Sequence, residues 1–135
     1  MTGAAQFLQA DGLYPGVPYA YAARVPPGAR TVHLAGACPL DADGHVVGPG
    51  DVVTQASACI DTMRLALAAA DAGIGDVVFV RTLVASSARE DLARVWEVVR
   101  DAFGDATPPG TLQGVTVLGW PGQLVEIEAV AAVAD

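Results

Sequence analysis

The strongest constraint on the fold is a helix pattern that is followed by a buried strand. Apolar residues recur at steps of three and four through residues 51–71, which predicts an amphipathic helix. Asp51 is placed to cap its N-terminus, and Gly73 ends it. The β-branched run Val77 to Val84 then predicts a strand that is buried on both faces or nearly so. Helix and buried strand in succession predict a helical layer on a sheet.

A second helix is expected directly after this strand. Ser87 and Glu90 have the spacing of a capping box, in which each side chain accepts a hydrogen bond from the other residue's backbone. The apolar face of this helix repeats at helical steps and comprises Leu92, Val95, Trp96, Val99 and Phe103.

Four further strands are predicted between turns rich in proline and glycine, at residues 19–25, 31–36, 111–118 and 124–133. The first two are expected to form one hairpin and the last two another. The resulting order, β-β-α-β-α-β-β, predicts an α+β fold with a mixed sheet and both helices on a single face. Residues 1–135 form one domain in this interpretation, and residues 1–15 are a loose N-terminal segment.

The last predicted strand carries two carboxylates. Glu126 and Glu128 alternate with aliphatic residues, so both side chains share one face of the sheet while Val125 and Ile127 share the other. Helices on a single face leave the second face uncovered in a monomer. A half-apolar uncovered face favours self-association.

The charge of the chain excludes several classes of partner and mechanism. The formal net charge is -8, and all 7 basic residues are arginine. An acidic surface without lysine argues against nucleic acid and anionic membranes as partners, and it excludes Schiff-base catalysis by lysine. Cys38 and Cys59 alone form neither a disulfide framework nor a metal site. No phosphate loop, metal-ligand cluster or nucleotide fingerprint is present, so we expect neither cofactor nor metal.

The sequence also predicts a location. Residues 1–13 lack the basic and apolar regions of a signal peptide, and no stretch has the length and composition of a membrane span. We therefore expect a cytoplasmic protein.

Four segments, taken in order and spacing, resemble the reactive intermediate deaminase (RidA/YjgF) family. The resemblance covers roughly residues 15–132, and each segment is similar to one of the family's motifs. The segments are Val17-Pro18-Tyr19-Ala20-Tyr21, Leu34-Ala35-Gly36-Ala37-Cys38-Pro39-Leu40-Asp41, Gly50-Asp51 with Gln55, and Leu124-Val125-Glu126-Ile127-Glu128-Ala129-Val130-Ala131.

This resemblance implies a chorismate-mutase-like fold and a homotrimer with ligand clefts between neighbouring subunits. Members of the family hydrolyse enamines and imines to a 2-oxo acid and ammonia. An arginine there grips the substrate carboxylate, as a bidentate guanidinium can. A glutamate at the place of Glu126 positions the attacking water, and a tyrosine at the place of Tyr19 lines the pocket.

The chain departs from the family pattern where the arginine belongs. That place falls on Thr111 or Gly110, and no basic residue follows Arg100 to replace it from the same predicted hairpin. Two polar pocket groups of the family become Ala35 and Ala37. The pocket is therefore expected to suit a neutral or weakly anionic ligand.

Three residues that are unusual for the family, Tyr21, His33 and Cys38, are candidates for new roles. Histidine side chains in general can change their charge near neutral pH, so His33 is a candidate acid or base, although a lone histidine in a strand is commonly a packed residue. Cys38 is a buried inert thiol or, with a base nearby, a nucleophile. Tyr21 is either a ligand contact or a surface residue.

We predict a cleft between subunits that is lined by Tyr19, His33, Cys38, Thr111, Trp120 and Glu126. Trp120 either closes this cleft or is an exposed turn residue. Glu128 is expected to be structural or to lie at the subunit interface.

Three functions stay open. The first is a cofactor-free enzyme that hydrolyses or deaminates an imine, an enamine or a related unsaturated carbonyl compound. The second is an enzyme for another acid–base step, a tautomerisation or cyclisation in a biosynthetic or degradative pathway. The third is a non-catalytic trimeric protein that binds a small molecule.

Overall fold

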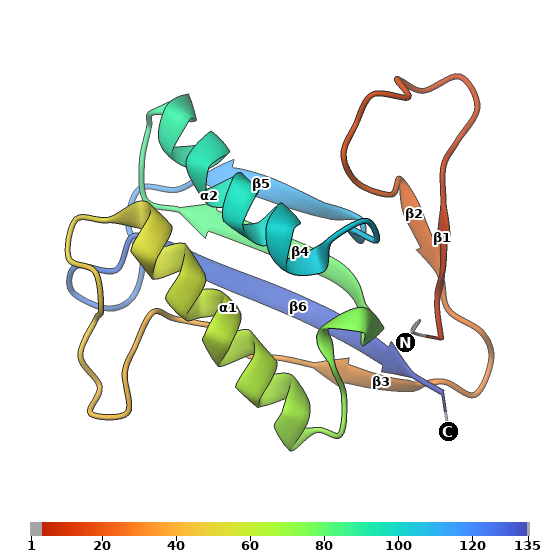
Figure 1. The fold of residues 1–135 in the computed structure, drawn as a ribbon, viewed down its shortest axis with the longest axis horizontal. Coiled ribbons are helices and arrows are strands. Elements are labelled where there is room, and N and C mark those ends of the chain that lie inside the picture. Colours follow the sequence, from red (N-terminus) through yellow and green to blue (C-terminus); the bar gives the residue numbers. More distant parts are fainter. Residues whose placement is uncertain (1–3, 135) are drawn as a thin grey trace.

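Strand β6 (Val125–Val133) occupies an interior position in a four-stranded sheet of the computed structural model, which describes residues 4–134. It pairs antiparallel with β3 (Arg30–His33) on one side and with β4 (Val77–Val84) on the other. Strand β5 (Gly110–Gly114) pairs parallel with β4, which gives the order β3-β6-β4-β5. The sheet is therefore mixed, as the sequence predicts (Figure 1).

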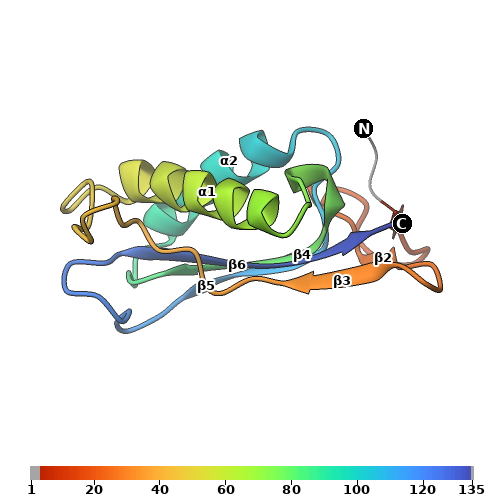
Figure 2. The same cartoon turned by 90° about the horizontal axis from the view of Figure 1, so that it is seen from below.

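Helices α1 (Val52–Ala69) and α2 (Arg89–Phe103) both cover the same face of this sheet, which confirms the predicted arrangement. Figure 2 shows the two layers edge-on, with the helices above the strands. A 3₁₀ turn at Ile74–Asp76 connects α1 to β4. The opposite face of the sheet is not covered by any helix of the part of the chain that the structure describes (Figure 2).

The core lies between the two layers. Alternate residues of β6 point toward the helices and are buried, because side chains of a strand alternate between its faces. Val125 and Ile127 lie in this core with Met63 and Leu67 of α1, each at most 1% exposed. Burial of each such side chain stabilises the fold by roughly 1.5–3 kcal/mol.

The two helices begin differently. The Asp51 carboxylate caps α1 as predicted, because it accepts hydrogen bonds from the backbone N–H groups of Val53 and Thr54, both at 3.1 Å. The predicted capping box of α2 is wrong, since its N-cap is Ala88, which offers no side-chain cap. The Ser86 hydroxyl instead accepts from the Ala88 N–H at 3.0 Å. It thereby closes the turn before the helix and leaves the Ser87–Glu90 spacing unused.

The first predicted hairpin is also wrong. Strand β2 (Ala22–Arg24) pairs with β1 (Gln6–Leu8) in a separate two-stranded sheet, whereas β3 crosses over to pair with β6. Residues 6–8 therefore have a regular strand structure within the segment that was predicted to be loose. Val32 of β3 packs on the core, and the long strand β6 offers it the apolar neighbours that the short β2 lacks.

The second predicted hairpin fails for a related reason. Strand β5 ends at Gly114, and its partner is β4 rather than β6. A strand, a helix and a strand in succession favour parallel pairing of the two strands. Strand β4 therefore lies between Thr111 and the strand that carries Glu126.

A buried glutamine ties the start of α1 to the turn that precedes β6. The Gln55 side chain is fully buried and serves three backbone groups of two loops. Its amide N–H₂ donates to the carbonyls of Gly48 and Gly122, at 3.2 and 3.1 Å. Its carbonyl accepts from the Leu124 N–H at 2.7 Å. This residue therefore fixes where β6 begins.

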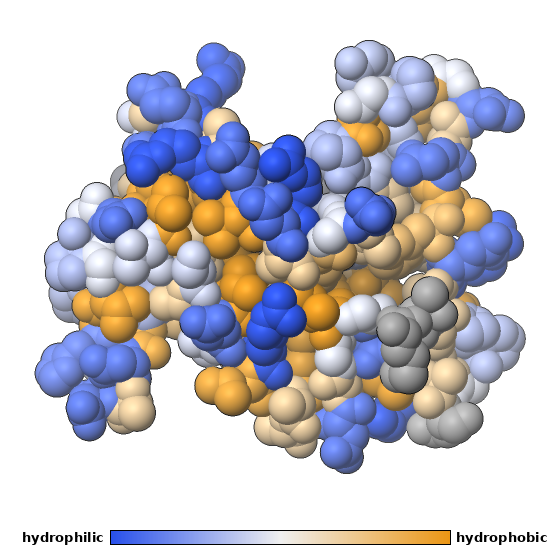
Figure 3. All heavy atoms as spheres, in the orientation of Figure 1, coloured by the Kyte–Doolittle hydropathy of each residue, from blue (hydrophilic) through white to orange (hydrophobic). Residues whose placement is uncertain are grey.

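The helix-covered surface is polar over α2 and more apolar between the helices, as Figure 3 shows. Within residues 4–134, no helix combines the length and the apolarity that crossing a membrane would require.

We predict that Gln55→Met lowers the free energy of unfolding by at least about 2 kcal/mol, because buried backbone groups that lose their partners cost about 1–3 kcal/mol each. Urea denaturation at a fixed protein concentration would measure the loss. A change below about 0.5 kcal/mol would show that the loops do not depend on this amide.

We predict the opposite sign for Thr82→Val. The Thr82 side chain is fully buried in β4, and its hydroxyl has no hydrogen-bond partner among the described residues. Replacing it by a methyl group removes an unsatisfied buried group, so stability is expected to rise by about 1 kcal/mol in the same urea measurement. A loss of stability would show that the hydroxyl is satisfied in solution.

Candidate functional site

Glu126 and Cys38 meet on the sheet face that the helices leave uncovered. Glu126 alternates with the buried Val125 and Ile127, so its side chain points away from the helices. The Cys38 thiol donates to Glu126 Oε1, with Sγ and Oε1 at 3.4 Å. Both side chains are half-buried. The structure thus brings together two of the predicted site residues that lie far apart in the sequence.

Gln123 and Trp120 complete this cluster from the turn before β6. Gln123 Nε2 donates to the same Glu126 Oε1 at 3.2 Å, and Gln123 Oε1 accepts from the Trp120 backbone N–H at 3.1 Å. Trp120 is about half-exposed, at 49%, and its side chain lies close enough to influence the Cys38 thiol. We call Cys38, Trp120, Gln123 and Glu126 the carboxylate cluster.

Gln123 is the member of the cluster that sequence reasoning missed. Strict alternation places it on the face opposite Glu126, together with Val125. The turn breaks this alternation, and the buried Gln123 side chain reaches both Glu126 and the carbonyl of Val125. The sequence did contain one signal for Gln123, because a polar residue stands there between a glycine-containing turn and a buried strand.

The absence of a side chain at Gly36 leaves room for the Glu126 carboxylate. A Cβ atom at position 36 would collide with the Glu126 carboxylate, Oε2 first. A larger residue where the chain leaves β3 would therefore displace the Glu126 side chain from its present position. The family motif around Gly36 thus has a local steric reason here.

Burial is the first cause that raises the pKa of the Cys38 thiol. The hydrogen bond to Glu126 and the charge of that carboxylate raise it further, while Gln123 and Trp120 lower it. The neutral thiol is therefore favoured at neutral pH. Cys59 differs in kind, because it is fully buried in the core and its thiol donates to the Val125 carbonyl at 3.4 Å. Burial raises the Cys59 pKa as well.

A second pair of charges lies farther along the same face. Arg81 of β4 and Glu128 of β6 form an ion pair at 2.9 Å, and both side chains are partly exposed, at 42% and 37%. The Arg81 guanidinium also lies over the Phe79 ring, 5.5 Å from its centre. Arg81 is the direct neighbour of Thr111 in the sheet, so its charge is next to one of the two positions, Gly110 and Thr111, at which the resemblance predicts the family's arginine.

His33 lies on the edge strand β3, opposite Val130, and its side chain is exposed. Val32 packs on the core, so His33 and the exposed Ala35 belong to the uncovered face. The two-residue offset that the sequence suggested is thus present, although His33 forms no hydrogen bond or ion pair with the carboxylate cluster among the described residues.

Tyr19 and Thr111 lie at the other edge of the sheet, in a surface cavity of about 520 Å³. We call it the aromatic cavity. The Tyr19 ring packs edge-to-face on Trp96 with centroids 6.3 Å apart, and it meets Tyr21 at 6.0 Å. Trp96 was predicted to be a core residue, but it is partly exposed and forms a wall here. No charged side chain belongs to the lining, which comprises Pro18, Tyr19, Trp96, Gly110, Thr111, Leu112 and Gln113.

Tyr21 faces a different space. Its hydroxyl donates to the Tyr14 carbonyl at 2.7 Å, and its ring borders a cavity formed by residues 9–13 with Pro15. The predicted site residues thus fall into two main groups, one around the interior strand β6 and the other beside the edge strand β5. Strand β4 separates them, so Thr111 and Glu126 are two strand spacings apart, roughly 10 Å or more.

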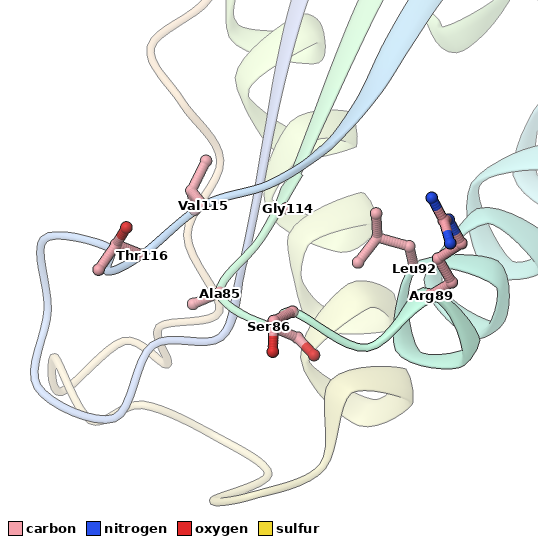
Figure 4. A pocket seen from close by; sticks show the side chains of 8 residues that line it. Ala85, Ser86, Arg89, Leu92, Gly114, Val115 and Thr116 are labelled. Atoms are coloured by element: carbon pink, nitrogen blue, oxygen red, sulfur yellow. The ribbon is translucent and has the colours of Figure 1, made fainter.

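A broader depression of about 780 Å³ lies between the start of α2 and the end of β5. Figure 4 shows Leu92 pointing into it, with Arg89 and Thr116 on either side. The Ser86 hydroxyl beside it donates to Asp91 at 2.7 Å and is engaged within the protein. The depression contains none of the residues predicted for the site.

Asp41, Asp43 and His45 offer ligand atoms within 4.8 Å of one another on an exposed loop. The Asp41 carboxylate accepts from the backbone N–H groups of Asp43 and His45, both at 2.9 Å, and these bonds, led by that from His45, lower its pKa. This geometry closes the turn of the loop. It is the one group of this kind in the described residues that has the spacing of a cation site.

The fold places this chain in the chorismate-mutase-like α+β class. A conserved Rid-family protein of unknown function from Yersinia pestis, YyfB, has a TM-score of 0.87 and 29% identity, covering 96% of this chain and 99% of that one. A member of the YjgF/YER057c/UK114 family from Mycobacterium tuberculosis has a TM-score of 0.65 and 32% identity over 96% and 99% of the two chains.

Sequence comparison gives the same result. Protein DfrA of Myxococcus xanthus is 35% identical over 114 residues, which are 84% of each chain. The family model described as Endoribonuclease L-PSP matches residues 12–133. The chain therefore belongs to the Rid family, which is also known as YjgF/YER057c/UK114.

We predict that Glu126→Gln lowers the pKa of Cys38, because it removes the negative charge and the acceptor that favour the neutral thiol. Iodoacetamide labelling of Cys38 as a function of pH, followed by peptide mass spectrometry, would measure this shift. Glu128→Gln is the matched control, since it removes the neighbouring carboxylate of the same face and should leave the Cys38 profile nearly unchanged. Equal profiles for the two variants would contradict the coupling.

Proposed function

We propose that this protein is a cofactor-free hydrolase for neutral imines or enamines, with Glu126 as the base that positions and activates water. The single observation that carries this proposal is the Glu126 carboxylate, which two donors hold in place on an open, half-apolar face. Gln123 and Cys38 both donate to Oε1. In the described residues the other oxygen, Oε2, accepts no such bond and is free to bind a water molecule.

The position of the two groups of residues supports a site between subunits. The carboxylate cluster has no opposing wall within the described residues, and the aromatic cavity lies at the other edge of the sheet. Contact between one edge of a protomer and the opposite edge of the next is a head-to-tail interface, which closes into a ring. We propose that this ring is a homotrimer, as in the family that the sequence resembles. Each cleft then joins the carboxylate cluster of one subunit to the aromatic cavity of another.

The charges favour a substrate without a carboxylate. Thr111 or Gly110 stands where the resemblance predicts the family's carboxylate-binding arginine, and the neighbouring Arg81 is paired with Glu128. The walls of the aromatic cavity are suited to an apolar or aromatic group of the substrate. The description of the family model as an endoribonuclease fits this chain poorly, because a net charge of -8 repels a polyanion.

We predict hydrolysis of N-benzylidenemethylamine, a neutral aromatic imine, at a rate above that in buffer. Glu126→Gln should lower this rate by about 10²–10⁴-fold, the usual contribution of a general base. Ultraviolet absorbance follows the loss of the imine. Wild-type protein that gives only the buffer rate on this and other neutral imines would overturn the proposal.

Carboxylated imines should be poor substrates. We expect little acceleration with 2-iminopropanoate, which an amino-acid oxidase generates from alanine. Thr111→Arg should restore about ten- to a hundredfold in kcat/KM, because a hydrogen bond to a charged group is worth about 1.5–3 kcal/mol. Strong activity of the unmodified chain on 2-iminopropanoate would contradict the substrate assignment.

The trimer gives a separate prediction. Light scattering at micromolar concentration should give roughly three times the 13.7 kDa of one chain. Leu83→Asp, which puts a charge beside Glu126 on the uncovered face, should dissociate the assembly. Leu65→Asp is the matched control, because Leu65 is 74% exposed on α1. A monomer mass for the unmodified chain would contradict the assembly.

A further inference from the structure

Water activation by Glu126 leaves the Cys38 thiol without a role, although hydrolysis of a C=N bond needs a proton donor as well as a base. Nitrogen must take up a proton when water adds to the carbon. Among the described residues, Cys38 is the side chain that both carries a transferable proton and is hydrogen-bonded to Glu126. Gln123, the other donor to this carboxylate, is an amide and does not exchange its proton in such a step.

We propose that Cys38 is the proton donor of the site and that it exchanges protons directly with Glu126, so that the two side chains act as one relay. This inference rests on the proposed imine hydrolysis and deepens it.

The geometry gives the two carboxylate oxygens of Glu126 different roles. Both described hydrogen bonds to Glu126 end on Oε1, at 3.4 Å from the Cys38 sulfur and 3.2 Å from Gln123 Nε2. Oε2 packs against Gly36, and none of the hydrogen bonds among the described residues ends on it. Oε2 is therefore the oxygen for water, and Oε1 is the oxygen for proton return. The sulfur itself is half-buried rather than enclosed, so a substrate nitrogen can reach it.

The steps balance without an oxidant or a further reactant. The water oxygen bonds to the imine carbon, the π electron pair moves to nitrogen, and nitrogen takes the S–H proton of Cys38. Glu126 takes one proton of the water. The carboxyl group then turns about its Cγ–Cδ bond, which brings the new O–H to the Cys38 thiolate, and it returns that proton, which restores both groups.

Collapse of the carbinolamine uses the same pair. Glu126 accepts the proton of the carbinolamine hydroxyl as the C=O bond forms. The C–N bond breaks, and the leaving amine takes its electron pair together with a second proton from Cys38. A final transfer from Glu126 to Cys38 resets the site.

The surroundings favour an acid over a nucleophile at Cys38. A nucleophilic cysteine needs a cation or a helix N-terminus that stabilises the thiolate. Cys38 instead faces the Glu126 carboxylate from β6, and the Cys59 thiol lies behind it on α1. The next charged groups along this face, Arg81 and Glu128, bind each other. His33 lies on the edge strand β3 and forms no hydrogen bond with the sulfur among the described residues.

The pH dependence follows from the same contacts. Burial and the adjacent carboxylate raise the pKa of Cys38, so the proton-bearing thiol persists above the usual pH for a free cysteine. Activity should therefore be maintained through neutral pH and should fall as the pH rises through the raised pKa.

The test compares Cys38→Ser with the unmodified chain on N-benzylidenemethylamine between pH 6 and pH 10, values chosen about the usual cysteine pKa of roughly 8.5. Serine keeps a hydroxyl that can bond Glu126, but it is a far weaker acid. We expect kcat to fall by about 10²-fold or more, with KM nearly unchanged, and the decline at high pH to disappear. Circular dichroism and light scattering would verify that the variant keeps its fold and assembly, and Cys38→Ala gives a second variant if serine perturbs either.

Three outcomes are distinct. A large fall in the kcat of Cys38→Ser, together with the disappearance of the decline at high pH, supports the relay. Full turnover by Cys38→Ser and Cys38→Ala, with the pH profile unchanged, overturns the relay and leaves the proposed hydrolysis standing. An unmodified chain that shows no turnover overturns the proposed function itself. Independently of turnover, identical Cys38 labelling profiles in the unmodified chain and Glu126→Gln would overturn the proton exchange.

Discussion

The strict alternation of side chains along β6 is the constraint on which the rest of the structure depends. One set of its residues, including Val125 and Ile127, closes the core against α1. The intervening set, which includes Glu126 and Glu128, is thereby forced onto the face without helices. A single strand thus supplies part of the core and also determines the face on which the carboxylates lie. A one-residue shift in register would exchange the two sets and destroy both properties.

The candidate site depends on a second, polar support. Gln55 joins the loop before α1 to the turn before β6, and that turn carries Trp120 and Gln123 to the Glu126 carboxylate. The site is therefore held by a buried amide that does not itself face the substrate side. This support explains how an exposed sheet face can present a carboxylate in one fixed orientation. Cys38 reaches the same carboxylate from the β3 side.

Sequence periodicity predicted the elements better than their pairing. Helix α1, helix α2 and strands β4 and β6 lie close to their expected positions, because their apolar periods are long and regular. Both predicted hairpins were wrong, since neighbours in sequence were assumed to be neighbours in the sheet. Strand β3 pairs with β6, and β5 pairs with β4, because burial of their apolar faces decides the pairing. The short strand β1 has too few residues to show a period.

The sequence by itself determined the element types, the buried face of β6 and the likeness that identifies Glu126, Tyr19 and the absent arginine. These properties are local, because they depend on residue spacing of two, three or four. Only the tertiary structure decided which side chains meet. It joined Cys38 to Glu126 across 88 positions, brought Gln123 to the same oxygen, and placed Thr111 on the edge strand β5, with β4 between it and Glu126. Such contacts follow from how strands order themselves over the core, and no pattern within a single segment contains that information.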